Sequence, residues 1–271
     1  MDTSYWQQQK SSAPLFPDVE WSKPQQKSHA GRLAIIGGNK LGFAGVAESY
    51  SVAYNSGVGI VRVLLPDALK KQIPVAWTDV ALAPSTVSGG FSKDATTHLL
   101  ALADWATMTL LIGDAGRNSE TAIVYESLIR NHIGPMVLTR DSIDLVKNSA
   151  DALVNRPETL LVLSFAQLQK LFQSVYYPKV LTFSMQLLQL VEAVHKFTVT
   201  YPITLAVLHK DILVVAHGGK VTTTPWESPM AIWRGTTATR AAVYWAWSPK
   251  QPLESITASL LVDTPPNPSV V

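Results

Sequence analysis

Short apolar runs rich in β-branched residues alternate along the chain with longer amphipathic segments. Strands of a parallel sheet are covered on both faces and therefore read as continuous apolar runs, whereas a surface helix keeps one apolar stripe. The alternation predicts βαβ units and a mainly parallel sheet with helices on both faces. The predicted strands are residues 33–36, 60–65, 109–112, 136–138, 160–163, 203–208 and 212–216.

Helical periodicity is clearest over residues 184–197, where apolar side chains recur every three to four positions and polar ones face away. This pattern predicts a surface helix that packs on the sheet. A further helix is predicted over residues 46–55. The apolar stripe of the first helix consists of Leu187, Leu188, Val191 and Val194.

The last predicted strand is followed by the turn residues His217, Gly218, Gly219 and Lys220 and by a β-branched run over 221–223. Two glycines between two apolar runs are typical of an antiparallel hairpin. The sheet is therefore predicted to be mixed, with a C-terminal hairpin added to a parallel core.

Both ends of the chain differ in composition from the middle. Residues 1–28 are rich in Gln, Ser, Pro and Lys and are expected to form an extended arm, although Trp6, Phe16 and Trp21 could dock. Residues 263–271 contain three prolines and are expected to form a short tail. One α/β domain is expected over residues 29–262.

The amino-acid composition argues against several kinds of functional site. The 271 residues are 47% hydrophobic and 15% charged, as in a packed globular protein, and the absence of cysteine excludes disulfides, thiolate catalysis and sulfur-ligated zinc. The six histidines show no HxxxH or HxH spacing, so no metal site is expected. The net charge of +2 comes from interspersed residues, which argues against nucleic acid as a partner.

Targeting signals are not evident either. The N-terminus lacks the basic start and apolar run of a secretory signal, and the most apolar window, residues 99–112, is too short to span a bilayer and contains Asp104. We therefore expect a cytoplasmic protein without a membrane segment.

The first candidate site follows the first predicted strand, where Gly37, Gly38 and Asn39 precede a helix. Glycines there allow close approach of an anionic ligand to the free amides and positive dipole of a helix N-terminus. They are equally compatible with a tight strand-to-helix turn that binds nothing. The spacing matches neither the Walker nor the GxGxxG pattern.

A second glycine loop, containing Gly113, Asp114, Gly116 and Arg117, follows the strand at 109–112 and leads into a helix capped near Asn118. Ligands of open parallel sheets sit outside the carboxyl ends of the strands, so the two loops could converge on one crevice. Taken alone, the second loop is ordinary loop chemistry.

The order of these motifs resembles that of a known enzyme family. The stretch SHAGRLAIIGGNKLGFAGVAESYSVAYNSGVGIVRVLLP resembles the opening of the ADP/ATP-dependent NAD(P)H-hydrate dehydratases of the ribokinase-like superfamily. Asn39 replaces the serine of their GGS motif, and Ala44-Gly45 stands where they have GA. The matching positions are Ser28-His29, Gly37-Gly38, Ser56-Gly57 and Gly59.

The resemblance extends at lower quality to about residue 262. The family's GPGLGR loop corresponds to Gly113–Arg117, its DADAL strand end to 139–143 with only Asp141 retained, and its TPHxGE segment to 162–167 with only Ser164 and Gln167 polar. The implied fold is a three-layer α/β/α ribokinase-like domain. The implied activity is repair of hydrated NADH or NADPH with ADP or ATP and Mg²⁺.

Site residues follow from the same resemblance. It places substrate on Gly37, Gly38, Asn39, Gly113 and Gly116, and nucleotide on Gly235, Thr236 and His209. The partner is then hydrated NAD(P)H or a nucleotide, provided that the crevice is open. A homo-oligomer is expected because the relatives assemble as tetramers.

The main departure lies in the last third. The family's GxGD aspartate, which acts as catalytic base, aligns with Thr237, or with Ala238 if the register slips by one. Loss of a positioned base costs about two to four powers of ten in rate. Trp233 and Arg234 replace small residues and are expected to crowd the approach of phosphates to the backbone.

Asp114 and Asp141 are the acids that could substitute for the missing base. Three functional hypotheses remain: a dehydratase with weak or lost activity, a non-catalytic nucleotide-binding protein, and an oligomeric structural protein whose crevice is filled by Trp233 and its neighbours. Four C-terminal tryptophans could stack a base or form a subunit contact, but core packing is the favoured interpretation. They are Trp226, Trp233, Trp245 and Trp247.

Overall fold

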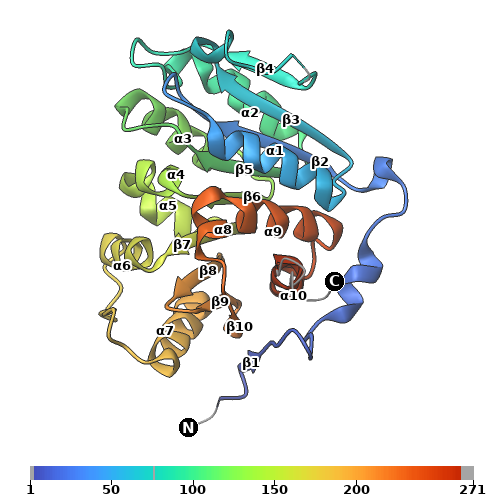
Figure 1. Cartoon of the computed structure of the whole chain (residues 1–271). Coiled ribbons are helices and arrows are strands. Elements are labelled where there is room, and N and C mark those ends of the chain that lie inside the picture. The colour runs from blue at the N-terminus through green and yellow to red at the C-terminus, as the bar shows by residue number, and fades with distance from the viewer. Residues whose placement is uncertain (1–2, 76, 264–271) are drawn as a thin grey trace.

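A single ten-stranded sheet runs through the computed structural model, which describes residues 3–75 and 77–263. Its strand order is β1-β10-β9-β8-β7-β6-β5-β2-β3-β4 (Figure 1). All neighbours pair in parallel except β8–β9 and β9–β10, which are antiparallel. The strands are β1 (Trp6–Gln8), β2 (Arg32–Gly37), β3 (Ile60–Pro66), β4 (Val80–Ala83), β5 (Met108–Gly113), β6 (Met136–Thr139), β7 (Thr159–Ser164), β8 (Thr204–His209), β9 (Ile212–His217) and β10 (Lys220–Pro225).

Helices cover both faces of this sheet and make the molecule three layers deep (Figure 1). Alternate strand residues point to opposite faces, so Ala34 and Ile36 join one buried cluster while Leu33 and Ile35 join the other. The first cluster packs under α2 (Thr96–Trp105), α3 (Ser119–Asn131), α4 (Asp141–Leu145), α5 (Ala150–Val154), α6 (Phe165–Ser174) and α7 (Leu187–Thr200). The second packs under α1 (Ala44–Ser56), α8 (Pro229–Arg234), α9 (Thr236–Trp247) and α10 (Pro252–Ser259).

The predicted three-layer α/β/α architecture with a mixed sheet and a C-terminal hairpin is confirmed. Each of the predicted strands and the hairpin strand at 221–223 is present, whereas β1 and β4 were not predicted. The helix predicted over 184–197 is α7, but its buried stripe is rotated from the predicted one. Leu188 is 37% exposed, and Leu190 and Phe197 are fully buried in its place.

The N-terminal segment packs along one end of the sheet. β1 pairs with β10, Trp6 Nε1 donates to Thr223 Oγ1 at 3.0 Å, and Gln9 is fully buried. Val19 enters the second buried cluster, whereas Trp21 is 87% exposed. The segment expected as an extended arm therefore contributes an edge strand and part of the core. Residues 264–271 of the predicted tail lie outside the described part of the chain.

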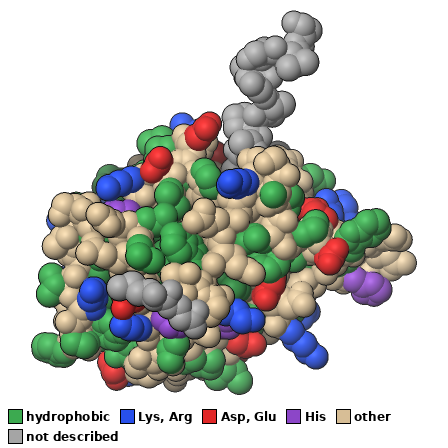
Figure 2. All heavy atoms as spheres, turned by 90° about the horizontal axis from the view of Figure 1, so that it is seen from below, with side chains coloured by type: hydrophobic (Ala, Val, Ile, Leu, Met, Phe, Trp, Pro, Cys, Tyr) green, Lys and Arg blue, Asp and Glu red, His purple; other side chains and the backbone are tan. Residues whose placement is uncertain are grey.

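Of the four C-terminal tryptophans, three pack in the core as predicted: Trp226, Trp245 and Trp247 are at most 9% exposed. Trp233 is 52% exposed. No helix among the described residues is long and apolar enough to cross a membrane. On the face seen in Figure 2, basic, acidic and apolar side chains are interspersed, in keeping with the small net charge.

Candidate functional site

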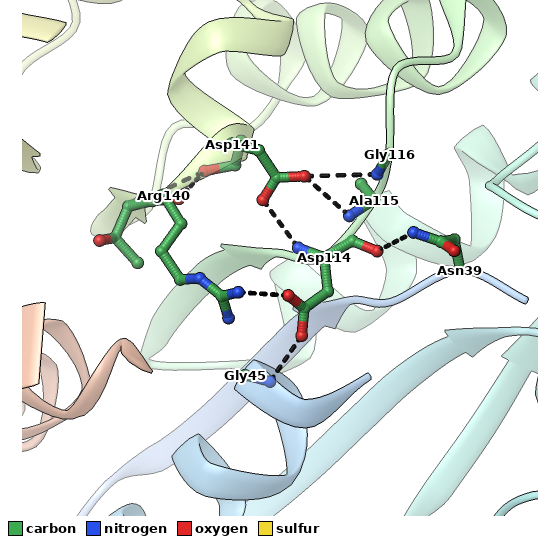
Figure 3. Close-up of polar contacts among 9 residues, drawn as sticks. Asn39, Gly45, Asp114, Ala115, Gly116, Arg140 and Asp141 are labelled. Carbon is green, nitrogen blue, oxygen red and sulfur yellow. Dashed lines mark hydrogen bonds and ion pairs between the residues drawn. The ribbon is translucent and has the colours of Figure 1, made fainter. Parts of the chain in front are cut away.

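The loops that follow β2, β5 and β6 meet at the carboxyl edge of the sheet, as the sequence predicted for the first two (Figure 3). The side chains at their centre are Asp114 from the β5 loop and Arg140 and Asp141 from the end of β6. Asp114 and Arg140 form an ion pair whose side chains are 15% and 22% exposed, respectively. The pair is therefore largely screened from solvent.

Asp114 acts as the cap of α1. The first turn of α1 has no capping side chain of its own, and the Gly45 N–H donates instead to Asp114 Oδ2 at 2.5 Å. A carboxylate at a helix N-terminus satisfies a free amide and interacts favourably with the helix dipole. The α1 N-terminus, which was a candidate anion site, is thus bound to an acid of the protein itself.

Arg140 covers the same turn from outside. A Cβ placed on Gly45 would lie 1.5 Å from Arg140 Nη1, so the guanidinium occupies the space that a side chain at residue 45 would need. Trp233 and Arg234, which were expected to crowd the approach of phosphates, are both exposed on α8. The guanidinium at the site is that of Arg140.

Asp141 binds the second glycine loop. Its carboxylate accepts N–H groups from Asp114 at 2.8 Å, Ala115 at 3.1 Å and Gly116 at 3.3 Å (Figure 3). A Cβ on Gly113 would lie 2.0 Å from Asp141 Oδ1, which explains the glycine there. Three convergent amides form an anion-binding concavity, and an internal carboxylate fills it. Asp141 is therefore not a free base.

Buried Tyr125 on α3 lies within the field of these acids. Burial first, and then the charges of Asp141 and Asp114, raise the pKa of its phenol well above the ordinary value of 10.0. The hydroxyl therefore stays neutral at any physiological pH.

The Gly37–Gly38–Asn39 loop is held against the β5 loop rather than kept open. The Gly38 N–H donates to Gly113 O at 2.8 Å, and Asn39 Nδ2 donates to Asp114 O. A Cβ on Gly37 would lie 2.4 Å from Gly113 O. Close packing of two loops thus accounts for the first glycine, in line with the alternative that the turn is structural.

The start of α9, where the family's base would stand, holds Thr237. Thr237 is 1% exposed, and its hydroxyl has no hydrogen-bond partner among the described residues. Gly235 is in the left-handed region, and a Cβ on it would lie 2.2 Å from Ile112 Cδ1, so this turn is packed directly on β5. On the side that faces β5, the Ile112 side chain therefore fills the space beside Gly235 in which a phosphate could have approached the backbone.

One carboxylate near this turn was not anticipated. Glu48 of α1 is half-buried, and its Oε1 accepts the hydroxyl of Thr236 at 3.5 Å. Sequence reasoning missed Glu48 because it lies in a helix 188 residues away from Thr236. Only the packing of α1 on α9 brings the two together.

The remaining predicted site residues are engaged in structure. His209 is 4% exposed, its Nε2 lies 3.1 Å from Met185 O, and its ring packs on Phe165. Ser164 and Gln167 form the capping box of α6. Each of these three side chains therefore has a hydrogen-bond partner within the protein.

An open groove lies beside the Asp141 loop, at the carboxyl ends of β5 and β6. We call it the α3–α6 groove; its volume is about 600 Å³. Arg117 and Lys147 are exposed in it and make no ion pair within the described part of the chain. Its lining is Gly116, Arg117, Asn118, Ser119, Ala122, Asp141, Asp144, Leu145, Lys147, Asn148 and Lys170. Across residues 3–75 and 77–263, no group of three or more acidic or histidine side chains could hold a metal ion.

Comparisons with known proteins establish the fold. No family model and no curated protein matches this sequence. Among solved structures, a ribokinase-like superfamily protein from Enterococcus faecalis V583 aligns with a TM-score of 0.72 and 14% identity, over 97% of this chain and 87% of that one. A hypothetical protein from Streptococcus mutans aligns with a TM-score of 0.68 and 14% identity, over 90% and 85%.

Two more distant matches are enzymes by their descriptions. The ADP/ATP-dependent NAD(P)H-hydrate dehydratase of Bacillus subtilis, co-crystallised with ATP and Mg²⁺, aligns with a TM-score of 0.57 and 10% identity, over 92% of this chain and 86% of that one. Phosphomethylpyrimidine kinase of Clostridium difficile 630 gives 0.54 and 10%, over 85% and 98%. The chain therefore has the ribokinase-like α/β/α fold.

Proposed function

We propose that this protein is a non-catalytic relative of the ribokinase-like enzymes that binds a phosphate-bearing ligand in the α3–α6 groove. The observation that carries the loss of catalysis is that the candidate acids are already bound to other groups of the protein. Thr237 replaces the base, while Asp114 and Asp141, the two possible substitutes, are bound to backbone amides and to Arg140. Carboxylate oxygens that already accept hydrogen bonds from the protein are not free to contact a substrate.

The groove supports the binding half of the proposal. Arg117 and Lys147 make no ion pair with the described residues, and Asn118 and Ser119 at the N-terminus of α3 line the groove together with them. A volume of about 600 Å³ suits a nucleotide-sized ligand. Nucleotide and Mg²⁺ use by a structural neighbour makes ADP, ATP and NADH the first ligands to test.

Binding and turnover are measured on the same preparation. ADP, ATP and NADH, each with and without Mg²⁺, are titrated by calorimetry, and hydrated NADH is assayed for dehydration with ADP or ATP. We expect saturable binding without turnover. R117Q/K147Q should weaken binding about tenfold or more, since hydrogen bonds to charged groups contribute about 1.5–3 kcal/mol. K179Q, at an exposed lysine outside the groove, should bind like the wild type. Binding that the double variant leaves unchanged contradicts the placement in this groove.

A second candidate function is dehydration or phosphoryl transfer with Glu48 as the proton acceptor. The observation in its favour is the Glu48 carboxylate 3.5 Å from the Thr236 hydroxyl at the first turn of α9. If the wild type does turn over hydrated NADH, E48Q should lower kcat by about two to four powers of ten. Turnover that survives E48Q eliminates this role.

A further inference from the structure

A second cavity, which shares no lining residue with the α3–α6 groove, lies under the edge strand β4. We call it the Trp105 pocket. It has a volume of about 460 Å³ and lies between β3, β4 and α2. Figure 1 shows β4 at one end of the sheet with α2 behind β3. Its lining includes Arg62, Leu64, Asp79, His98, Leu102 and Trp105.

Two arginines converge on the indole of this pocket. The Arg62 Cζ lies 4.2 Å from the Trp105 ring centroid, and the Arg32 Cζ lies 5.5 Å from it. Arg32 and Arg62 point to the same face of neighbouring parallel strands, since Arg62 is in register with Ala34, two residues beyond Arg32. The strand pairing therefore fixes two like charges beside one aromatic ring.

Neither guanidinium has an anionic partner within the described part of the chain. Among the residues that the structure describes, Arg32 and Arg62 make no side-chain hydrogen bond and no ion pair, and both are exposed. The nearby acids have other partners: Asp104 pairs with His132 at 3.0 Å, and Asp79, which also lines the pocket, accepts the Thr78 hydroxyl at 3.4 Å. The contact with the indole face holds the Arg62 guanidinium beside the pocket, and its N–H groups have no hydrogen-bond acceptor among the described residues.

Half of the pocket lining is aliphatic. Leu64 is fully buried, Leu102 is 8% exposed, and Val80, Ala81 and Ala101 add further apolar surface, while Thr78, Asp79 and His98 are polar residues of the same lining. Pockets of this volume that combine apolar walls with a few placed polar groups are typical of small-molecule sites. A carboxylate matches the fork geometry of arginine, whereas the walls match a hydrocarbon body.

We infer that the Trp105 pocket is a binding site for an organic carboxylate with an apolar body, whose carboxylate pairs with Arg62 while its body lies against Leu64 and Leu102. The site is separate from the α3–α6 groove and does not depend on any nucleotide chemistry. Arg32 adds positive potential from beside the pocket without lining it.

The test uses naphthalene-2-carboxylate as the probe and the uncharged naphthalene-2-carboxamide as its isostere, both titrated into the full chain by ligand-detected NMR. We expect saturable binding of the carboxylate and at least about tenfold weaker binding of the amide. Arg62→Gln removes the charge but keeps an amphipathic stem, and should weaken carboxylate binding by about tenfold or more. Arg234→Gln, at an exposed arginine on α8, should leave it unchanged.

A steric variant makes the test independent of charge. Ala101 is exposed on α2 and lines the pocket, so Ala101→Phe should fill the cavity without disturbing the core and should abolish binding. Circular dichroism confirms that each variant is folded. Absence of saturable binding at millimolar carboxylate, equal affinity for the amide, or unchanged affinity in both Arg62→Gln and Ala101→Phe overturns the inference.

Discussion

At the scale of single residues, Asp114 and Arg140 form a structural unit that no local sequence pattern predicts. Both have positive φ angles, 55° and 58°, and the second residue is an arginine, which seldom adopts that region. Such backbone strain costs about 1–3 kcal/mol per residue and persists only where surrounding contacts impose it. Here the ion pair and the cap on α1 are those contacts.

The first prediction concerns this ion pair. Arg140→Met should lower the free energy of unfolding by about 2–3 kcal/mol, because it leaves the Asp114 carboxylate largely buried with only the Gly45 amide as partner. In the D114N background, Arg140→Met should lower the free energy of unfolding by less than it does in the wild type. The difference between the two effects should be about 1 kcal/mol or more. Urea denaturation of the four proteins measures the coupling, and additive effects would show that the pair is not a stabilising unit.

The second prediction concerns Gly45 in the first turn of α1, where replacement by alanine should have the opposite effect to the usual one. Gly→Ala inside a helix normally stabilises by about 0.5–1 kcal/mol, but Gly45→Ala should destabilise because the new methyl group displaces Arg140 from Asp114. In an R140A background only Asp114 Oδ2, at 3.0 Å from the added Cβ, remains close, so the substitution should be much less destabilising or should stabilise. Thermal unfolding of the single and double variants decides the sign. A stabilising effect of Gly45→Ala alone would mean that Arg140 does not occupy this space.

Sequence reasoning found the right loops at this scale and left open whether they bind a ligand or only form tight turns. Gly37, Gly113 and Asp141 do meet at the carboxyl edge, because strand ends in a parallel sheet must share one edge. Whether a glycine loop binds a foreign anion or an internal one depends on a side chain from another loop. Asp141 lies 27 residues from the amide of Asp114 that it binds. No spacing rule encodes such a contact.

At the scale of elements, burial patterns predicted the strands well where both faces are covered. β5, β6 and β7 lie mid-sheet and read as continuous apolar runs. β1 has the sequence Trp-Gln-Gln, which shows neither an apolar run nor an alternation, and β4 has the sequence Val-Ala-Leu-Ala, in which two of the four residues are alanines of low strand propensity. Both are at the sheet's edges, where pairing with a single neighbour and packing by distant segments decide the structure. The rotation of α7 likewise reflects the position of the sheet beneath it.

The third prediction concerns β9. Burial lowers the pKa of His217 below its ordinary value of 6.5, opposed only in part by the charge of Glu254. The unfolded chain therefore binds a proton more readily than the native one, and stability should fall as the pH drops from 6.5 to the lowered native pKa. Above 6.5 and below the native pKa this contribution is flat.

Comparison with His217→Gln isolates the effect. The glutamine can keep a polar contact with Thr204, whose hydroxyl lies 2.9 Å from His217 Nδ1, but it cannot titrate. The difference in unfolding free energy between wild type and variant should change with pH by at most about 1.4 kcal/mol per unit within the window. Parallel stability curves between pH 5 and 8 would contradict the assignment.

At the scale of the whole molecule, the N-terminal segment supplies the edge strand at one end of the sheet. The Val221 N–H donates to Tyr5 O and the Gln9 N–H donates to Thr223 O, each at 2.8 Å, so β1 satisfies the outer edge of β10. Gln9 then links β10 to α10, because its Nε2 donates to Thr224 Oγ1 at 3.3 Å and to Thr257 O at 2.8 Å. A segment of polar composition thus serves as part of the scaffold.

The fourth prediction tests that role. Deletion of residues 1–10 should lower the free energy of unfolding by at least about 2 kcal/mol, since several hydrogen bonds of about 0.5–1.5 kcal/mol are lost together. It should also expose the edge of β10, and an exposed edge strand promotes intermolecular pairing. Light scattering of the truncated protein should therefore rise with concentration. Gln9→Ala is the matched control, because it breaks the link to α10 but leaves β1 in place, and so should lose stability without self-association. A truncated protein that stays monomeric with an unchanged unfolding midpoint would show that the segment only rests on a sheet whose stability lies elsewhere.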